Sequence, residues 1–219
     1  MESDFLQLTL SLDLMAFVAV VLLHLVKSTT YTLRLYALQS AAVATIIIVL
    51  GIAGDELGLV IVGVVTFIAK VIVAPYFFLR LLRRFGHLVA STSYLSTPAT
   101  LAVMLGLIVF AASQSFAALW TVSSVTPDVF VFNIAMVFIA IFLLINRQGA
   151  LAQIIAVLAL ENSVVLFALF LGVKQTLALE LGIVFDILVW MVIAYAFLRL
   201  VHRQFGSLDT REMNRLIED

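Results

Sequence analysis

The sequence contains no cysteine in its 219 residues. Disulfides, thiolate metal sites, an iron–sulfur cluster of its own and a cysteine nucleophile are therefore excluded. Charge is also scarce, because Asp, Glu, Lys and Arg make up only 11% of the residues, against about 25% in soluble domains. The formal net charge is -1, so no excess of basic residues points to nucleic acid as a partner.

Catalytic motifs are missing as well. The sequence has no phosphate-binding loop, no Gly-rich dinucleotide turn, no HExxH pair and no nucleophile elbow. Its three histidines are too scattered for a metal site. We therefore expect neither a metal nor a cofactor in this chain, and we do not expect the chain alone to catalyse a reaction.

Apolar residues are what the sequence has in abundance. They make up 64% of the chain, against roughly 45–50% in soluble domains, and only lipid can accept that much apolar surface. A transmembrane helix needs about 20 mainly apolar residues. The sequence predicts an all-α integral membrane protein with about seven such helices, at 5–26, 33–53, 57–82, 98–120, 129–145, 150–171 and 177–201.

Basic residues indicate the orientation in the membrane. With seven helices, all of the 12 lysines and arginines except Lys70 and Lys174 fall on one side. Acidic residues gather on the other side: Glu2, Asp4, Asp55, Glu56 and Asp128. Loops rich in Lys and Arg stay in the cytoplasm, which predicts a multi-pass protein with its N-terminus outside and its C-terminus cytoplasmic. His24 is expected at the cytoplasmic interface.

Two stretches of the chain resemble each other. Gln39-Ser-Ala-Ala-Val-Ala-Thr precedes Phe78-Leu-Arg-Leu, as Glu161-Asn-Ser-Val-Val-Leu-Phe precedes Phe197-Leu-Arg-Leu. Repeats of this kind are common in transport folds, and this one predicts two parallel three-helix units in which Gln39 takes the place of Glu161. The alternative is chance similarity between apolar sequences. The repeat divides the chain into an N-terminal unit, a connector with the fourth helix, a C-terminal unit and a polar cytoplasmic tail, at 1–86, 87–127, 128–206 and 207–219.

Among the charged residues inside the predicted helices, we single out Lys70, Glu161 and Asp186 as candidates for buried charges. A charge at a helix centre costs about 2.5–3.5 kcal/mol on insertion scales, so such residues face protein or water and usually have a function there. A carboxyl group in low-dielectric surroundings can exchange a proton near neutral pH. We interpret the three residues as a path for protons or other ions. The alternative is a structural ion pair, and the sequence does not show which groups touch.

Polar neighbours are candidate helpers of these charges. Gln39 and Asn162 can hydrogen-bond across helices, with plain helix packing as the alternative. Glu180 lies at the outer end of the last predicted helix, where it can also simply reach the interface. Pro75 lies five residues after Lys70 and removes a backbone donor, which frees the carbonyl of Val71 and can kink the helix. The alternative is a proline that the membrane helix simply tolerates.

These residues carry a resemblance to a known family. The stretches Ala159-Leu-Glu-Asn-Ser-Val, Phe185-Asp-Ile and Gly206-Ser-Leu-Asp-Thr resemble the K-type subunit of respiratory complex I. Over nearly all helices except the fourth, the chain is similar to the longer form of that subunit, hydrogenase-4 component E, including Gln39-Ser and Phe67-Ile-Ala-Lys-Val. The resemblance implies that Glu161 and Asp186 match the two intramembrane acids of the K-type subunit. The second acid is Glu in complex I and Asp here, whereas Lys70 matches only the longer form.

The resemblance also implies partners and a role. Such subunits lie in the membrane arm of complex I-like assemblies, including formate hydrogenlyase and other group 4 membrane-bound hydrogenases. The expected partners are antiporter-like and other membrane-arm subunits, together with hydrophilic nickel–iron hydrogenase-like and iron–sulfur subunits that hold the redox chemistry. The chain would then be a non-catalytic subunit that contributes to proton or sodium translocation. The alternatives are a subunit of a multisubunit cation/proton antiporter and a structural scaffold of the membrane arm.

Overall fold

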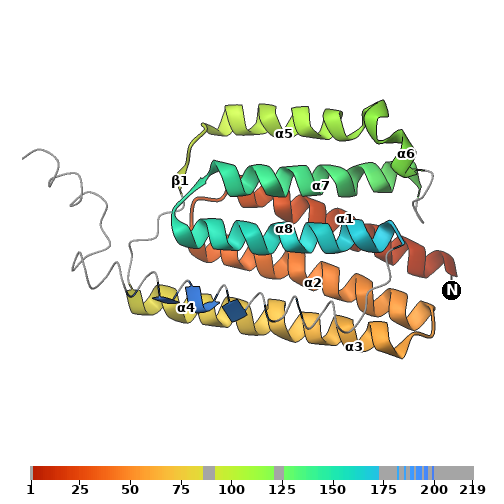
Figure 1. Cartoon of the computed structure of the whole chain (residues 1–219), viewed down its shortest axis with the longest axis horizontal. Coiled ribbons are helices and arrows are strands. Elements are labelled where there is room, and N and C mark those ends of the chain that lie inside the picture. The colour runs from red at the N-terminus through yellow and green to blue at the C-terminus, as the bar shows by residue number, and fades with distance from the viewer. Residues whose placement is uncertain are drawn as a thin grey trace, which may run out of the picture.

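The protein is an all-α multi-pass membrane protein. Its structure, a computed structural model, describes residues 2–85, 92–120 and 126–172, together with single positions between 182 and 199. Long apolar helices lie side by side, and each runs antiparallel to the helix before it along the chain (Figure 1). Of the predicted seventh helix, 177–201, the structure describes only separate helical positions between 182 and 199.

The helices follow the apolar runs of the sequence. Five helical stretches in the described part of the chain are long and apolar enough to cross a membrane: Phe5–Leu25, Thr29–Ala53, Leu57–Arg83, Val129–Asn146 and Leu151–Phe170. They match five of the predicted transmembrane helices. The elements themselves are α1 (Glu2–Leu25), α2 (Thr29–Ala53), α3 (Leu57–Thr66), η1 (Phe67–Val73), α4 (Ala74–Phe85), β1 (Thr92–Ser93), α5 (Thr97–Ala111), η2 (Gln114–Phe116), α6 (Ala117–Trp120), α7 (Pro127–Asn146), β2 (Arg147–Gln148) and α8 (Ala150–Phe170).

The fourth predicted helix, 98–120, is shorter than expected. Helix α5 ends at Ala111, and a turn separates it from the short helices η2 and α6. The break coincides with Ser113, Gln114 and Ser115. Serine has a lower helix propensity than alanine or leucine, and Ser113 lies at the N-cap of η2 without a side-chain cap hydrogen bond.

Short turns connect the helices at both ends of the bundle. Asp55 in the turn between α2 and α3 has a φ of 54°, a conformation that Asp adopts more readily than most residues. Between β2 and α8, Gly149 has a φ of 96°, where a side chain would be strained. The residues of β1 pair antiparallel with those of β2, Thr92 opposite Gln148 and Ser93 opposite Arg147. This pairing fixes the start of α5 to the turn between α7 and α8.

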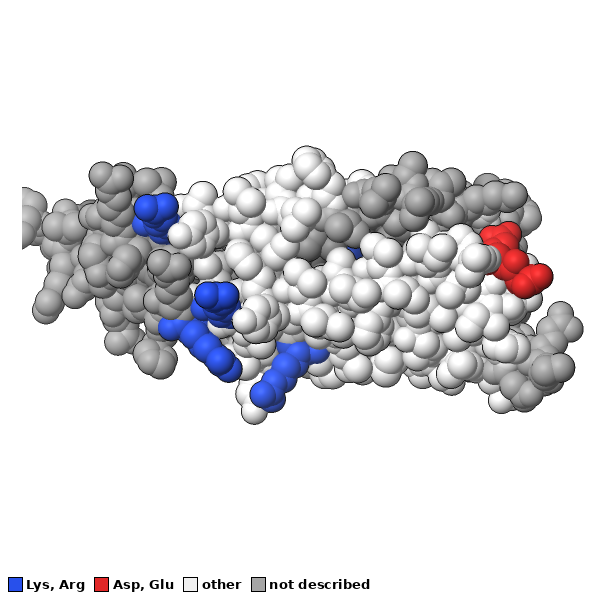
Figure 2. Space-filling model, turned by 90° about the horizontal axis from the view of Figure 1, so that it is seen from below, with Lys and Arg blue, Asp and Glu red and all other residues white. Residues whose placement is uncertain are grey.

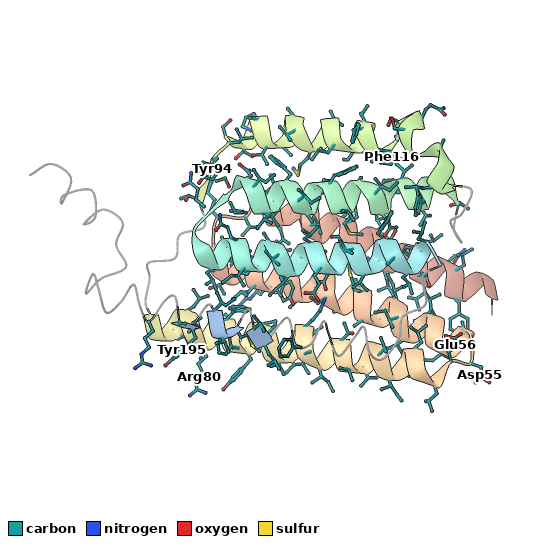
Figure 3. All side chains as sticks on the ribbon, in the orientation of Figure 1. Asp55, Glu56, Arg80, Tyr94, Phe116 and Tyr195 are labelled. Carbon is teal, nitrogen blue, oxygen red and sulfur yellow. The ribbon has the colours of Figure 1, made fainter. Side chains whose placement is uncertain are left out.

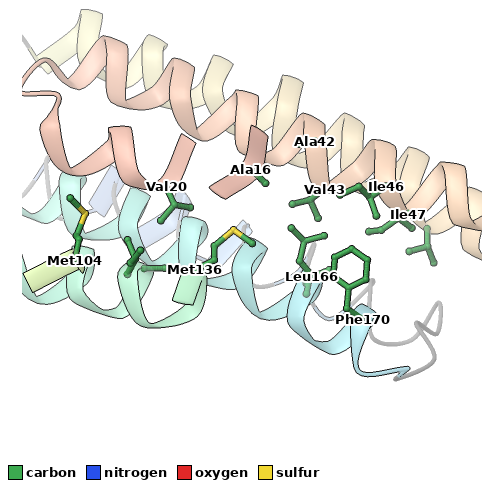
Figure 4. Packing of buried hydrophobic residues seen from close by; sticks show 14 residues of the cluster. Ala16, Val20, Ala42, Val43, Ile46, Ile47, Met104, Met136, Leu166 and Phe170 are labelled. Carbon is green, nitrogen blue, oxygen red and sulfur yellow. The ribbon is translucent and has the colours of Figure 1, made fainter. Parts of the chain in front are cut away.

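The largest apolar cluster lies where α1, α2, α3, α5, α7 and α8 meet (Figure 4). Its labelled members are Ala16, Val20, Ala42, Val43, Ile46, Ile47, Met104, Met136, Leu166 and Phe170. Large apolar side chains also cover the outside, as Leu57 at 73% exposure and Val109 at 66% show. An outer surface of this kind is disfavoured in water and suited to lipid.

Charged side chains gather at the two ends of the bundle. Figure 2 shows Lys and Arg at one end, Asp and Glu at the other, and a nearly uncharged surface between them. Arg80 lies near the first end, together with Tyr94 and Tyr195, whereas Asp55 and Glu56 lie in the turn at the second end (Figure 3). We call these the basic end and the acidic end.

Candidate intramembrane charge site

Lys70 lies in the middle of a long, continuous helix formed by α3, η1 and α4. The central part, η1, is a seven-residue π-helix in which the backbone N–H of Ala74 donates to the carbonyl of Ala69, five residues back. Pro75 explains this local geometry, because it has no N–H to offer the next carbonyl of an α-helical ladder. The helix thus widens at Lys70 and remains continuous, and π-helical turns are frequent at functional sites.

The ammonium group of Lys70 contacts two consecutive residues of α8. Its Nζ atom lies 3.0 Å from Glu161 Oε1 and donates a hydrogen bond of 3.0 Å to Asn162 Oδ1. The side chain of Lys70 is 1% exposed and that of Glu161 is 17% exposed. A lysine and a glutamate predicted separately from the sequence therefore form one buried ion pair.

Polar side chains of α2 complete the site. Asn162 Nδ2 donates to Ser40 Oγ over 2.8 Å. Gln39, which is fully buried, donates from Nε2 to the carbonyl of Ala159 over 3.1 Å and to Ser163 Oγ over 3.3 Å. The charge network of Lys70, Glu161, Asn162, Ser40, Gln39 and Ser163 thus joins η1, α8 and α2, and α2 and α8 run in the same direction (Figure 1).

The network has a specific chemical capacity. With Lys70 protonated and Glu161 ionised, the pair carries no net charge, whereas a single unpaired charge at this position would be far more costly. Adding a proton to Glu161 or removing one from Lys70 changes the charge of the pair by one unit. Such a change is strongly felt by nearby groups, because Coulomb interactions are weakly screened away from water. The arrangement is therefore suited to holding one proton in alternative positions.

Of the predicted site residues, the structure brings together Lys70, Glu161, Asn162 and Gln39. Asp186 and Glu180 lie outside the described residues. No group of three or more His, Asp or Glu residues that could hold a metal ion occurs in the described ranges.

Arg147 has a role that the sequence analysis missed. We expected it in a cytoplasmic loop, but it is 1% exposed and donates from Nη2 to the carbonyls of Leu23 and Val26 at the end of α1. Burial lowers the pKa of its guanidinium from the usual value, although arginine stays charged at neutral pH. A cation at this position complements the negative end of the helix dipole and pairs carbonyls that α1 leaves free.

His24 is also buried, although we expected it at the cytoplasmic interface. It is 5% exposed, its Nε2 lies 3.0 Å from the carbonyl of Ile139, and its ring stacks on Phe142 at a centroid distance of 4.9 Å. Asp13, on the same helix, is 4% exposed and accepts a hydrogen bond from Asn133. The criterion that selected Lys70, a charge inside an apolar run, also applies to Asp13 and would have selected it.

Comparison with known proteins gives one relative of undefined role. No known protein family model matches the chain, and no solved structure matches it. The chain is similar to the uncharacterized protein Rv0085 of Mycobacterium tuberculosis, with 28% identity over 191 residues, which cover 84% of each chain. The similarity extends over most of both chains, but the name of the relative describes no function. Functional interpretation therefore depends on the charge network itself.

Proposed function

We propose that this chain is a membrane-arm subunit of a complex I-like or group 4 hydrogenase-type complex, in which it contributes buried charges to proton or sodium translocation. The observation that carries the proposal is the Lys70–Glu161 pair, with 3.0 Å between Nζ and Oε1 at mid-helix positions of η1 and α8. Intramembrane charges are rare and usually mark ion pathways. The resemblance of the Glu161 and Lys70 motifs to hydrogenase-4 component E supports the same role.

In the proposed mechanism, Glu161 takes up and releases the translocated proton. Lys70 responds to the charge of Glu161, and Asn162 Oδ1 keeps a hydrogen bond to Lys70 in either state. Gln39 and Ser40 hold the facing side of α8 in position. Asp186 and Glu180 would continue the path in the seventh helix. Redox chemistry would take place in hydrophilic partner subunits, and the chain itself would hold no cofactor.

The number of helices, their orientation in the membrane and the two three-helix units are part of the same proposal. We place seven helices in a prokaryotic inner membrane, with the basic end in the cytoplasm, because loops rich in Lys and Arg remain on that side. The parallel course of α2 and α8 supports two three-helix units. So does the pairing of Ser40 with Asn162 and of Gln39 with Ser163, which joins corresponding parts of the predicted repeat.

The decisive test replaces Glu161 with glutamine. Glu161→Gln keeps an oxygen that can accept from Lys70, so we expect the complex to assemble in normal amount and to lose ion movement coupled to turnover. Glu56→Gln, in the exposed turn between α2 and α3, is the matched control and should change neither property. Assembly is measured by purification in mild detergent, and coupling by pH changes inside sealed vesicles.

One observation favours a scaffold role as the second candidate. In the charge network, Lys70, Asn162, Ser40 and Ser163 all have hydrogen-bond partners, which is typical of a structural site, although Gln39 Oε1 has none in the described chain. The scaffold role is right if Glu161→Gln lowers the amount of complex while coupling per assembled complex stays normal. Mass spectrometry of co-purified proteins identifies the complex. Hydrogenase-like and iron–sulfur subunits support the proposal, whereas antiporter subunits alone would point to a cation/proton antiporter.

A further inference from the structure

A second buried carboxyl group lies between α1 and α7, outside the charge network. Asp13, near the midpoint of α1, is 4% exposed, and Asn133 of α7 is fully buried. Asn133 Nδ2 donates to Asp13 Oδ2 over 3.1 Å and to the carbonyl of Val129 over 3.0 Å. Both hydrogens of the amide nitrogen are therefore in use.

Two oxygen atoms of this pair have no donor. Asp13 Oδ1 and Asn133 Oδ1 are both buried, and neither has a hydrogen-bond partner within the described ranges. Ionised Asp13 could accept about four hydrogen bonds, yet it has one. A buried acceptor without a donor costs free energy, and the cost is largest for a charged group.

The helices packed against Asp13 supply no countercharge. Helix α5 contains no titratable residue, and the titratable residue of α7 is Asp128 at its start. On α2, Tyr31, Arg34 and Tyr36 lie toward the basic end. None of the hydrogen bonds or ion pairs in the described chain joins Asp13 to a lysine, arginine or histidine. On α1 itself, the apolar residues Ala16 and Val20 follow, and His24 lies three turns away.

We infer that Asp13 and Asn133 form a second proton-binding site, in which Asp13 carries an exchangeable proton on Oδ1 at neutral pH. Protonation forms one O–H bond and turns Asp13 Oδ1 from an acceptor into a donor. The acceptor is Asn133 Oδ1, on the amide group that already donates to the other Asp13 oxygen. One proton thus satisfies both unpaired atoms and removes an uncompensated charge. The site involves neither Glu161 nor Lys70, so it stands whether or not the proposed function is correct.

Substitutions of Asp13 test whether its carboxyl group is protonated or ionised. An asparagine at this position offers an N–H to Asn133 Oδ1 and a carbonyl to Asn133 Nδ2, which is the pattern of the protonated acid. We expect Asp13→Asn to keep the melting temperature of the wild-type protein in detergent, and Asp13→Leu to lower it. If Asp13→Asn lowers it as much as Asp13→Leu does, Asp13 is ionised and the inference is wrong.

Infrared spectroscopy of the full chain in lipid vesicles tests the proton directly. The wild-type minus Asp13→Asn difference spectrum should contain the carbonyl band of a neutral carboxyl group, and this band should shift after transfer to heavy water. A carboxylate band in its place would overturn the inference, and so would a neutral band that does not shift, because the proton would then not exchange.

Labelling with dicyclohexylcarbodiimide, an apolar reagent for protonated carboxyl groups, adds a site-resolved measurement. Peptide mass spectrometry should find Asp13 modified at neutral pH, less so as the pH is raised, and the exposed Asp55 unmodified throughout. Modification of Asp13 that does not change with pH would contradict an exchangeable proton.

Discussion

The ammonium nitrogen of Lys70 lies 3.0 Å from the carboxylate of Glu161, at the point where the π-helical turns of η1 face α8. Helix α2 packs against both η1 and α8, and the Lys70 side chain reaches from η1 to α8. The contact therefore couples the relative position of η1 and α8 to the charges of the two side chains. This energetic coupling can be measured.

A double-mutant cycle should show strong coupling between Lys70 and Glu161. Lys70→Met alone leaves a buried carboxylate without its cation, and we expect it to destabilise the protein. In the double variant Lys70→Met/Glu161→Gln neither charge remains, so part of the stability should return. We expect a coupling energy of about 1–3 kcal/mol, measured by unfolding in mixed micelles. Strictly additive effects would mean that the two charges do not interact in the folded protein.

Gly63 should be intolerant of a side chain. A Cβ atom there would lie 2.5 Å from Ile48 Cγ1 and 3.0 Å from the Ile48 backbone nitrogen, because α3 lies close against α2. We expect Gly63→Ala to destabilise the protein by about 1–3 kcal/mol through overpacking.

Gly58, on the same helix, provides the matched control. A Cβ atom there meets no other atom within 4 Å, so Gly58→Ala should be neutral or slightly stabilising, by up to about 1 kcal/mol. Equal effects at the two positions would contradict the close contact between α2 and α3. Thermal unfolding in detergent is a sufficient measurement for both variants.

Arg147 should contribute to stability through its guanidinium group and not only through its charge. Arg147→Met leaves the carbonyls of Leu23 and Val26 without this donor, and we expect a loss of about 1.5–3 kcal/mol, as for hydrogen bonds to charged groups. Arg147→Lys should recover only part of it, because an ammonium group lacks the planar fork. Arg80→Met, at an exposed position of α4, should have little effect. Full recovery by lysine would show that charge alone matters.

Asn146 should slow local opening of the chain at the start of α5. Its Oδ1 accepts from the backbone N–H of Leu95 over 3.0 Å, and its Nδ2 donates to Thr100 Oγ1 over 3.3 Å. We expect Asn146→Leu to raise hydrogen exchange around residues 94–100 and to leave α2 unchanged.

Gln148→Leu, which removes only the exposed contact between Gln148 and Thr92, is the control for this prediction. It should have a clearly smaller effect on exchange in the same segment. Equally small effects of the two variants would assign the attachment of α5 to the backbone pairing of β1 with β2 and not to the side chain of Asn146.

The sequence predicted the helices well, for a physical reason. In lipid, a helix must be long and apolar, so runs such as Thr29–Ala53 are visible without any knowledge of packing. The same reasoning selected Lys70 and Glu161, because each is costly where it lies. It did not predict that they touch, since contacts between helices depend on how the helices rotate and pack.

Residues at the helix ends were harder to predict. A cation just after an apolar run, such as Arg147, normally lies in water, and its burial depends on where the end of α1 lies, some 120 positions earlier in the chain. The early end of α5 was readable in principle from Ser113 and Ser115, but the apolar residues on both sides obscured it. The burial of Arg147 thus depends on a neighbouring helix, whereas the end of α5 depends on local residues.

The length of α5 has a consequence for the surrounding lipid. A helix of 15 residues is about 22 Å long, whereas the hydrocarbon core of a bilayer is about 30 Å thick. Leu105 and Val109 point outward from it and are largely exposed. Hydrophobic mismatch of this kind is relieved by local thinning of the bilayer or by association with another protein. The edge of the bundle formed by α5 is therefore sensitive to acyl-chain length, and lipids with shorter chains should collect there.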